Sequence, residues 1–255
     1  MHDYGSMLWR TRHAYNQFMS HLQRVQLYLS TEHPCGYLPQ RQSRNAYVDP
    51  TYALNPDRYA RLIEQGFRRS GEHVYRPYCA DCQKCLAARV PVERFRPDRS
   101  QQRCIRRNRD LHWRIAPSAT DEHYDLFCRY IASRHAGEGM DDGNRESFNA
   151  FLECRWGTTQ FWEFRDETRL LCVAVVDALP LALSAVYTFF EPEAAARGLG
   201  TYAVLQQIEQ ARVRGLEYVY LGYWVEGSRK MDYKRRYQPL EIFRSGGWEP
   251  LQPSG

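Results

Sequence analysis

The sequence predicts an α+β fold in which a smaller β-rich module precedes a mixed sheet flanked by helices. Short alternating apolar segments and turn residues dominate residues 1–110, whereas residues 111–255 predict the order helix, helix, three strands, helix, strand. The final strand–helix–strand unit predicts a parallel strand pair, because a chain that returns through a helix re-enters the sheet in the same direction. We therefore expect a boundary near residue 110.

The β-rich region begins with an alternating segment at residues 25–29, which is typical of a short strand. The Asn-Pro pair at residues 55–56 predicts the start of a helix, and Gly66 predicts its end. A hairpin is expected from residue 67 to residue 78, and a strand from residue 86 to residue 95.

The second region carries most of the expected helices. Ser118 or Thr120 can cap a first helix that has apolar residues on one face, and a Gly- and Asp-rich loop follows at residues 135–144. The remaining elements follow in chain order: a helix at 146–155, strands at 160–164, 170–176 and 181–190, a helix at 201–214 and a strand at 218–223.

Composition indicates a cytoplasmic globular protein that does not enter a membrane. The first 30 residues are polar and aromatic, without the apolar segment of a signal peptide. The longest apolar region, residues 170–190, is broken by Asp177 and Pro180, so it predicts two strands and not a membrane span. Eight cysteines in 255 residues are too few for a disulfide scaffold, which agrees with a reducing compartment. The oligomeric state is left open.

Positive charge is concentrated in one block. The net charge is +5, but residues 94–114 contain eight arginines against Asp98 and Asp110, a local +6. Such a block favours a polyanion site over a merely solvated face.

The most informative stretch runs from Glu217 to Glu241. A β-branched and aromatic strand is followed after Gly227 by closely spaced cations that alternate with tyrosines. Only three of the 35 basic residues are lysines, and two of them, Lys230 and Lys234, lie here. Cations interleaved with aromatic rings suit phosphates and exposed bases, although a solvated basic loop is an equally good interpretation of the pattern alone.

A second candidate site precedes the helix at 201–214. Arg197, Gly198 and Gly200 lie where unpaired backbone N–H groups and the positive end of a helix dipole could bind a phosphate. This arrangement resembles the acyl-coenzyme A N-acetyltransferase (GNAT) fold, in which such a loop holds a pyrophosphate. An ordinary glycine-containing connection is the alternative.

Three cysteines, Cys79, Cys82 and Cys85, have the spacing of a zinc or iron–sulfur knuckle. A fourth ligand could be Cys35, His33 or Cys104. Buried or idle thiols are the favoured interpretation, so we expect no required cofactor.

The motifs together resemble the arginyl-tRNA–protein transferase family, and most closely its bacterial branch, which moves leucine from leucyl-tRNA to proteins that begin with Asp or Glu. The resemblance covers nearly the whole chain and is carried by six segments: residues 35–39 (CGYLP), 66–71 (GFRRSG), 75–85, 99–108, 198–202 (GLGTY) and 222–234 (GYWVEGSRKMDYK). Eukaryotic relatives that transfer arginine carry a second cysteine three places after the one that matches Cys35. Leu38 stands there, which favours the leucyl branch.

The resemblance implies an aminoacyl transferase with a GNAT-like C-terminal domain that acts in the N-end rule pathway. An arginyl donor, an acetyl-coenzyme A-dependent N-acyltransferase and a non-catalytic tRNA-binding protein are the alternatives. The reaction is aminolysis of an activated ester, which positioning and modest proton removal can accomplish.

Three site roles follow as hypotheses. Tyr223 and Glu226, expected just past the last strand, would orient the amine or accept its proton. Arg76, helped by Arg41 or Arg44, would pair with the acidic first side chain of the acceptor. The tRNA would be bound by the cations and the glycine loop: Lys230, Lys234, Arg197, Gly198, Gly200, Arg103 and Arg107.

Overall fold

The structure is a computed structural model that describes residues 25–134 and 144–252. Two expectations lie outside these ranges: the N-terminal segment before residue 25 and nearly all of the Gly- and Asp-rich loop at 135–144.

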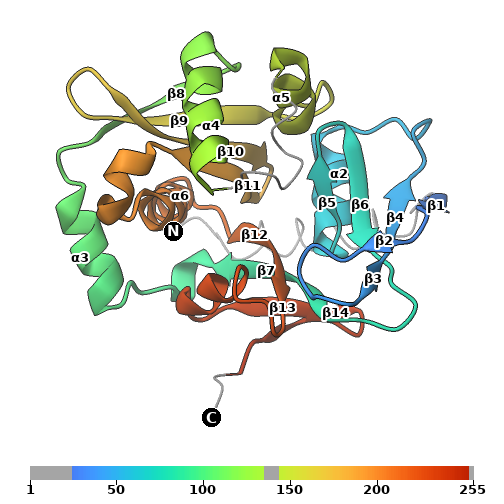
Figure 1. The fold of residues 1–255 in the computed structure, drawn as a ribbon. Helices are drawn as coiled ribbons and strands as arrows, with labels where there is room; N and C mark the ends of the chain where they lie inside the picture. Colours follow the sequence, from blue (N-terminus) through green and yellow to red (C-terminus); the bar gives the residue numbers. More distant parts are fainter. Residues whose placement is uncertain (1–24, 135–143, 253–255) are drawn as a thin grey trace, which may run out of the picture.

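A large mixed sheet dominates the molecule (Figure 1). Its eight strands run in the order β14-β13-β7-β12-β11-β10-β9-β8. Neighbours are antiparallel except β11 and β12, which confirms the parallel pair expected around the strand–helix–strand unit. The strands are β7 (Cys85–Pro91), β8 (His112–Ala116), β9 (Thr159–Arg165), β10 (Leu170–Leu179), β11 (Ala182–Phe190), β12 (Tyr218–Val225), β13 (Glu241–Arg244) and β14 (Gly247–Pro250).

Helices cover both faces of this sheet, and strand alternation explains how one strand supplies two cores. In β10, Cys172, Ala174 and Val176 belong to the core under α6 (Leu199–Val213). The intervening Val173 and Val175 belong to the core under α4 (Asp121–Arg134) and α5 (Arg145–Leu152). The expected mixed sheet flanked by helices is therefore confirmed.

The N-terminal module is a four-stranded sheet beside the large sheet, at the right in Figure 1. Its strands run in the order β1-β4-β6-β5: β1 (Leu27–Leu29), β4 (Asn45–Val48), β6 (His73–Pro77) and β5 (Arg68–Ser70). A two-stranded ladder, β2 (His33–Pro34) with β3 (Gln42–Ser43), joins it. Helix α2 (Pro56–Glu64) begins as expected, because the Asn55 side chain accepts a hydrogen bond from the Arg58 backbone N–H.

The boundary expected near residue 110 does not separate the two sheets. Strand β7 comes from the first region, yet it lies between β12 and β13 in the large sheet. Its residues Ala88 and Val90 are buried in the main core, so exclusion of apolar surface from water places this strand there. The middle of the arginine-rich block forms helix α3 (Arg99–Arg107), which packs against α6.

Three 3₁₀ segments complete the described fold: η2 (Val92–Arg94), η3 (Pro192–Arg197) and η4 (Asp232–Arg236). Within residues 25–134 and 144–252, the helices are all too short or too polar to span a bilayer.

Candidate functional site

The site begins where the two parallel strands separate. Strands β11 and β12 pair over only three residues, Ala182–Ser184 with Tyr218–Tyr220. Beyond that point each strand has a register irregularity against its other neighbour, and Gly222 adopts a positive φ of 80°. The guanidinium of Arg68 fills the base of the opening and donates to Ser184 Oγ (3.1 Å) and to the Ala185 carbonyl (2.6 Å).

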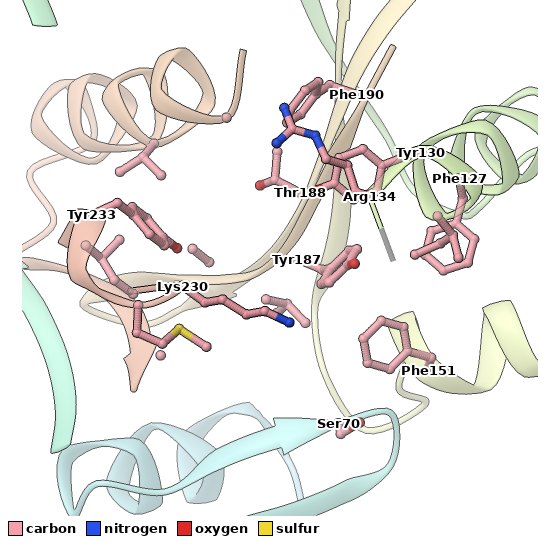
Figure 2. A pocket seen from close by; sticks show the side chains of 18 of the residues that line it. Ser70, Phe127, Tyr130, Arg134, Phe151, Tyr187, Thr188, Phe190, Lys230 and Tyr233 are labelled. Atoms are coloured by element: carbon pink, nitrogen blue, oxygen red, sulfur yellow. The ribbon is translucent and has the colours of Figure 1, made fainter. Parts of the chain in front are cut away.

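A pocket of about 1470 Å³ occupies this opening. Its wall combines β5, α4, α5, β11, the first turn of α6, β12 and the turn at residues 230–237, together with Gly36 and Tyr37 from the N-terminal module. Figure 2 shows the Lys230 ammonium and the Tyr233 hydroxyl pointing into the space, with Tyr187 and Phe151 across from them. The pocket therefore joins segments that are far apart in the sequence.

One end of the pocket is aromatic. Tyr187 packs against Phe151 with ring centroids 5.2 Å apart, and Tyr130 packs against Phe190 at 5.0 Å. These rings form a rigid apolar wall that suits an aliphatic side chain or a base. Its lining residues are Tyr124, Phe127, Tyr130, Phe148, Phe151, Tyr187 and Phe190.

The charged side chains among the described lining residues are all basic. No Asp or Glu of the two described ranges lines the pocket. Positive charge gathered in a partly enclosed space favours an anionic ligand. The cationic lining residues are Arg68, Arg69, Arg134, Lys230 and Lys234.

The first turn of α6 forms another part of the wall. Gly198 precedes the helix in the left-handed conformation (φ 71°), and Gly198, Gly200 and Thr201 line the pocket. An added Cβ at Gly198 would lie 3.4 Å from Cys104 Sγ, so both conformation and space favour glycine. Lys230, Tyr223 and the glycine loop therefore line one pocket.

Comparison with known proteins assigns the family. The model described as "Arginine-tRNA-protein transferase, N terminus" matches residues 33–103, and the corresponding C-terminus model matches residues 122–244. The aspartate/glutamate leucyltransferase of Stenotrophomonas maltophilia is 51% identical over 231 residues, covering 88% of this chain and 92% of that protein. The aspartate/glutamate leucyltransferase of Pseudomonas fluorescens is 46% identical over 234 residues, covering 91% of this chain and 100% of that protein. The chain belongs to the arginine-tRNA-protein transferase family. A solved GCN5-related glucosamine N-acetyltransferase region of a fungal β-N-acetylglucosaminidase is 11% identical with a TM-score of 0.41, covering 76% of this chain and 23% of that one.

Within this family member, Lys234 does not lie where a surface phosphate ligand would. Its residue is 4% exposed, and its Nζ donates to the Tyr223 carbonyl and to Met231 Sδ (3.3 Å). Burial, and secondly the charge of Arg68, lower its pKa to about 7. Lys234 therefore has both charge states available near neutral pH. Contact of Lys234 with a tRNA phosphate stays a prediction, and the structure shows that η4 turns this side chain inward toward β12.

Arg197 is also committed within the fold. Its guanidinium donates to Asn108 Oδ1 (2.9 Å) and Asp110 Oδ1 (2.5 Å), and this bond to Asp110 lowers the pKa of that carboxyl. Arg107 in turn donates to the Ala196 carbonyl. Both residues join α3 to the turn before α6, and neither lines the pocket. Arg103 is exposed on α3, outside the pocket, so its contact with tRNA stays a prediction.

The two residues expected to handle the amine are separated. Tyr223 lies inside β12, which extends to Val225, so the expected strand end at 223 is wrong. Its hydroxyl donates toward the carbonyls of Gly66 (2.9 Å) and Tyr75 (3.2 Å), and burial raises its pKa well above the usual range. Glu226 is exposed, 3.8 Å from Lys84 Nζ, and does not line the pocket.

The arginines expected to bind the acceptor lie outside the pocket. The Arg76 guanidinium lies 5.0 Å from the centre of the Phe67 ring, and Arg41 donates to the Asp81 carbonyl (3.3 Å). Arg68 and Arg69 line the pocket instead. The GFRRSG segment could have indicated a buried arginine. Consecutive residues of a strand point to opposite faces, so at least one of two adjacent arginines must face the protein interior.

The cysteine knuckle is brought together but is not arranged as a metal site. Burial, and then the nearby Cys35, Cys79 and Cys82, raise the pKa of Cys85 to about 12. A metal would need these thiols as thiolates. In the described ranges, no three His, Cys, Asp or Glu residues are placed to hold a metal ion. Metal binding by Cys35, Cys79, Cys82 and Cys85 thus stays a prediction, as does the absence of a required cofactor.

Proposed function

We propose that this chain transfers leucine from leucyl-tRNA to the α-amino group of proteins with N-terminal Asp or Glu, which marks them for degradation by the N-end rule pathway. One observation carries the proposal: a single pocket combines a helix N-terminus, an aromatic wall and five basic side chains, of which Arg69 is paired with Asp177, with no described carboxylate in its lining. Such a pocket suits a phosphate, an apolar aminoacyl group and an acidic acceptor together.

The donor is the charged 3′-end of tRNA. Backbone N–H groups in the first turn of α6, with Lys230 nearby, are placed to bind a phosphate of the terminal nucleotides. The rings of Phe151 and Tyr187 offer an apolar surface to the leucyl side chain. A donor arginine would bring a guanidinium into a space already rich in cations, with no described carboxylate to pair with it. This feature favours leucine over arginine.

The chemistry is direct aminolysis. The acceptor amine attacks the ester carbonyl carbon, a C–N bond forms, and the C–O bond to the terminal ribose breaks. Lys234 in its neutral form accepts the proton that the amine loses and returns a proton to the departing ribose oxygen, so the lysine is regenerated. A base with a pKa near the working pH suits both steps. Tyr223, whose carbonyl accepts from Lys234, holds the base in place.

The test is a transfer assay with purified protein and an Asp-starting reporter. Leucyl-tRNA, arginyl-tRNA and acetyl-coenzyme A are supplied separately, and the mass of the reporter is measured. We expect the mass of one leucyl residue to be added from leucyl-tRNA alone. Addition of arginine or acetyl would identify one of the alternative transferases, and binding of tRNA with no change in mass would indicate a non-catalytic protein.

A further inference from the structure

Two neighbouring arginines in β5 have different electrostatic surroundings. The Arg69 guanidinium binds both carboxylate oxygens of Asp177, at 2.7 Å and 2.6 Å, and also reaches Thr159 Oγ1. Arg68 is as deeply buried, at 6% exposure against 5%, yet its partners are a hydroxyl and a carbonyl. No carboxylate of the two described ranges pairs with Arg68.

A buried cation without a counter-charge is costly, and an anion that enters beside it lowers that cost. Arg68 lies at the pocket wall, and its charge contributes to the lowered pKa of Lys234, so the two cations are close enough to act on one ligand. The described groups that face Lys234 include no carboxylate. They are Arg68 on β5, Cys85 on β7, which opposes the lowering of the pKa, Tyr223 on β12 and Tyr233 on its own turn.

The backbone of β12 leaves room next to this guanidinium. Gly222 has a positive φ, and an added Cβ would lie 3.5 Å from an Arg68 guanidinium nitrogen. A side chain at residue 222 would fill the space beside the Arg68 guanidinium. Glycine therefore serves both the strand irregularity and the free space beside the cation.

We propose that Arg68 is the specificity-determining residue that binds the side-chain carboxylate of the acceptor's N-terminal Asp or Glu. This inference rests on the proposed leucyl transfer and names the residue that selects its acceptor. A guanidinium matches a carboxylate with two parallel hydrogen bonds, which an uncharged Asn or Gln side chain cannot reproduce. Binding there holds the α-amine of the same residue near Lys234.

The shape of the site favours a protein carboxylate over a tRNA phosphate. Arg68 lies at the base of the opening and is almost completely buried, so its anion must arrive on a thin stem. The side chain of Asp or Glu is such a stem, whereas a phosphodiester carries a sugar on each side. The exposed Lys230 and the first turn of α6 are better placed for phosphates.

The test uses four reporters that differ only in their first residue: Asp, Asn, Glu and Gln. Wild-type protein should prefer each acid over its amide. In Arg68→Gln we expect the Asp/Asn and Glu/Gln ratios of kcat/KM to fall by roughly 10- to 100-fold, the usual range for a lost hydrogen bond to a charged group. Arg68→Lys, which keeps the charge but not the two-pronged geometry, should retain an intermediate preference. The matched control is Arg76→Gln on the adjacent strand, which should leave both ratios unchanged.

A binding measurement needs no variant to be active. The melting temperature of wild-type protein is measured with Asp-Ala-amide and with Asn-Ala-amide, and we expect stabilisation by the acidic peptide only. Equal stabilisation by both peptides would overturn the proposal. An Arg68→Gln protein that keeps the wild-type Asp/Asn ratio would also overturn it. If in that protein the leucyl-tRNA affinity falls and its salt dependence weakens, Arg68 would be assigned to a tRNA phosphate. If wild-type protein transfers leucine to no reporter, the proposed function fails, and the peptide measurement still decides whether Arg68 binds a carboxylate.

Discussion

Two clusters of buried charge in the molecule are built in opposite ways. At the β8–β9 edge, Glu163 is 1% exposed and accepts hydrogen bonds from Arg114 (2.8 Å), Arg165 (2.7 Å) and His123 (3.0 Å). In the pocket, Arg68 and Lys234 are similarly buried, but their partners among residues 25–134 and 144–252 are uncharged. The first cluster contains its own counter-charges, whereas no carboxylate of the described residues pairs with Arg68 or Lys234.

The pKa directions express this difference. Burial alone would raise the pKa of Glu163, but hydrogen bonds from Arg114, Arg165 and His123 lower it to about 2. Burial lowers the pKa of His123 despite its acidic neighbour, so the imidazole is neutral at pH 7. At Lys234 burial and the charge of Arg68 outweigh the opposing effect of Cys85, and the pKa falls to about 7. Glu163 has charged partners in the fold, whereas the described partners of Arg68 and Lys234 are uncharged, as the proposed binding of an anionic ligand requires.

The largest effect is expected from removing the pocket amine. Lys234→Met should lower leucyl transfer at least about 100-fold, because positioned proton transfer contributes at least that much. The measurement is single-turnover transfer from saturating leucyl-tRNA. Lys230→Met is the matched control and should weaken tRNA binding with a smaller salt slope, at a nearly unchanged saturated rate. A Lys234→Met rate within threefold of wild type would contradict the role.

The same substitution should change stability with a definite sign. The folded pKa of Lys234, about 7, lies below its unfolded value near 10.4, so between these values the unfolded state binds more protons and wild-type stability rises with pH. Replacing the lysine removes this dependence. The difference in unfolding free energy, Lys234→Met minus wild type, should therefore be on the order of 3 kcal/mol larger at pH 7 than at pH 10. Urea unfolding at both pH values measures it, and a pH-independent difference would argue against a buried amine.

Breaking the complete cluster should affect stability and leave specificity alone. Glu163→Gln should lower the unfolding free energy at pH 7 by about 2 kcal/mol, because hydrogen bonds to a charged group are lost beside buried His123. Since the pKa of Glu163 is depressed, the wild-type contribution is complete above about pH 5 and is lost as pH falls toward 2. The stability of Glu163→Gln should not show this decrease at low pH, and melting temperatures of both proteins between pH 3 and pH 7 test the expectation. The Asp/Asn preference should stay at the wild-type value.

The smallest effect is expected at Glu226. Glu226→Gln should change leucyl transfer by less than about twofold, because the carboxylate is exposed and its interaction with Lys84 is a surface ion pair. The transfer assay with the Asp reporter measures this. A loss of tenfold or more would return Glu226 to the chemistry and weaken the assignment of Lys234.

Much of the fold was accessible from sequence because its signals are local. Asn55 caps α2, the arginine pair leads into a hairpin, and the final strand–helix–strand unit forms the parallel pair. The glycine loop before α6 could be placed in the site for the same reason, since its role depends on its own backbone. The membership of β7 could not, because an apolar strand shows no sign of which sheet it will join.

The roles of the cations were decided by tertiary structure alone. Lys230 and Lys234 are equivalent in a charge pattern, yet one is exposed and the other is buried against β12. Arg68 and Arg69 are adjacent, yet only one meets Asp177, a residue more than a hundred positions away. The sequence by itself predicted a cluster of cations and a glycine loop suited to binding phosphate. Tertiary structure decides which cation is buried and which pairs with a carboxylate, because the segments responsible are distant in sequence and come into contact only on folding.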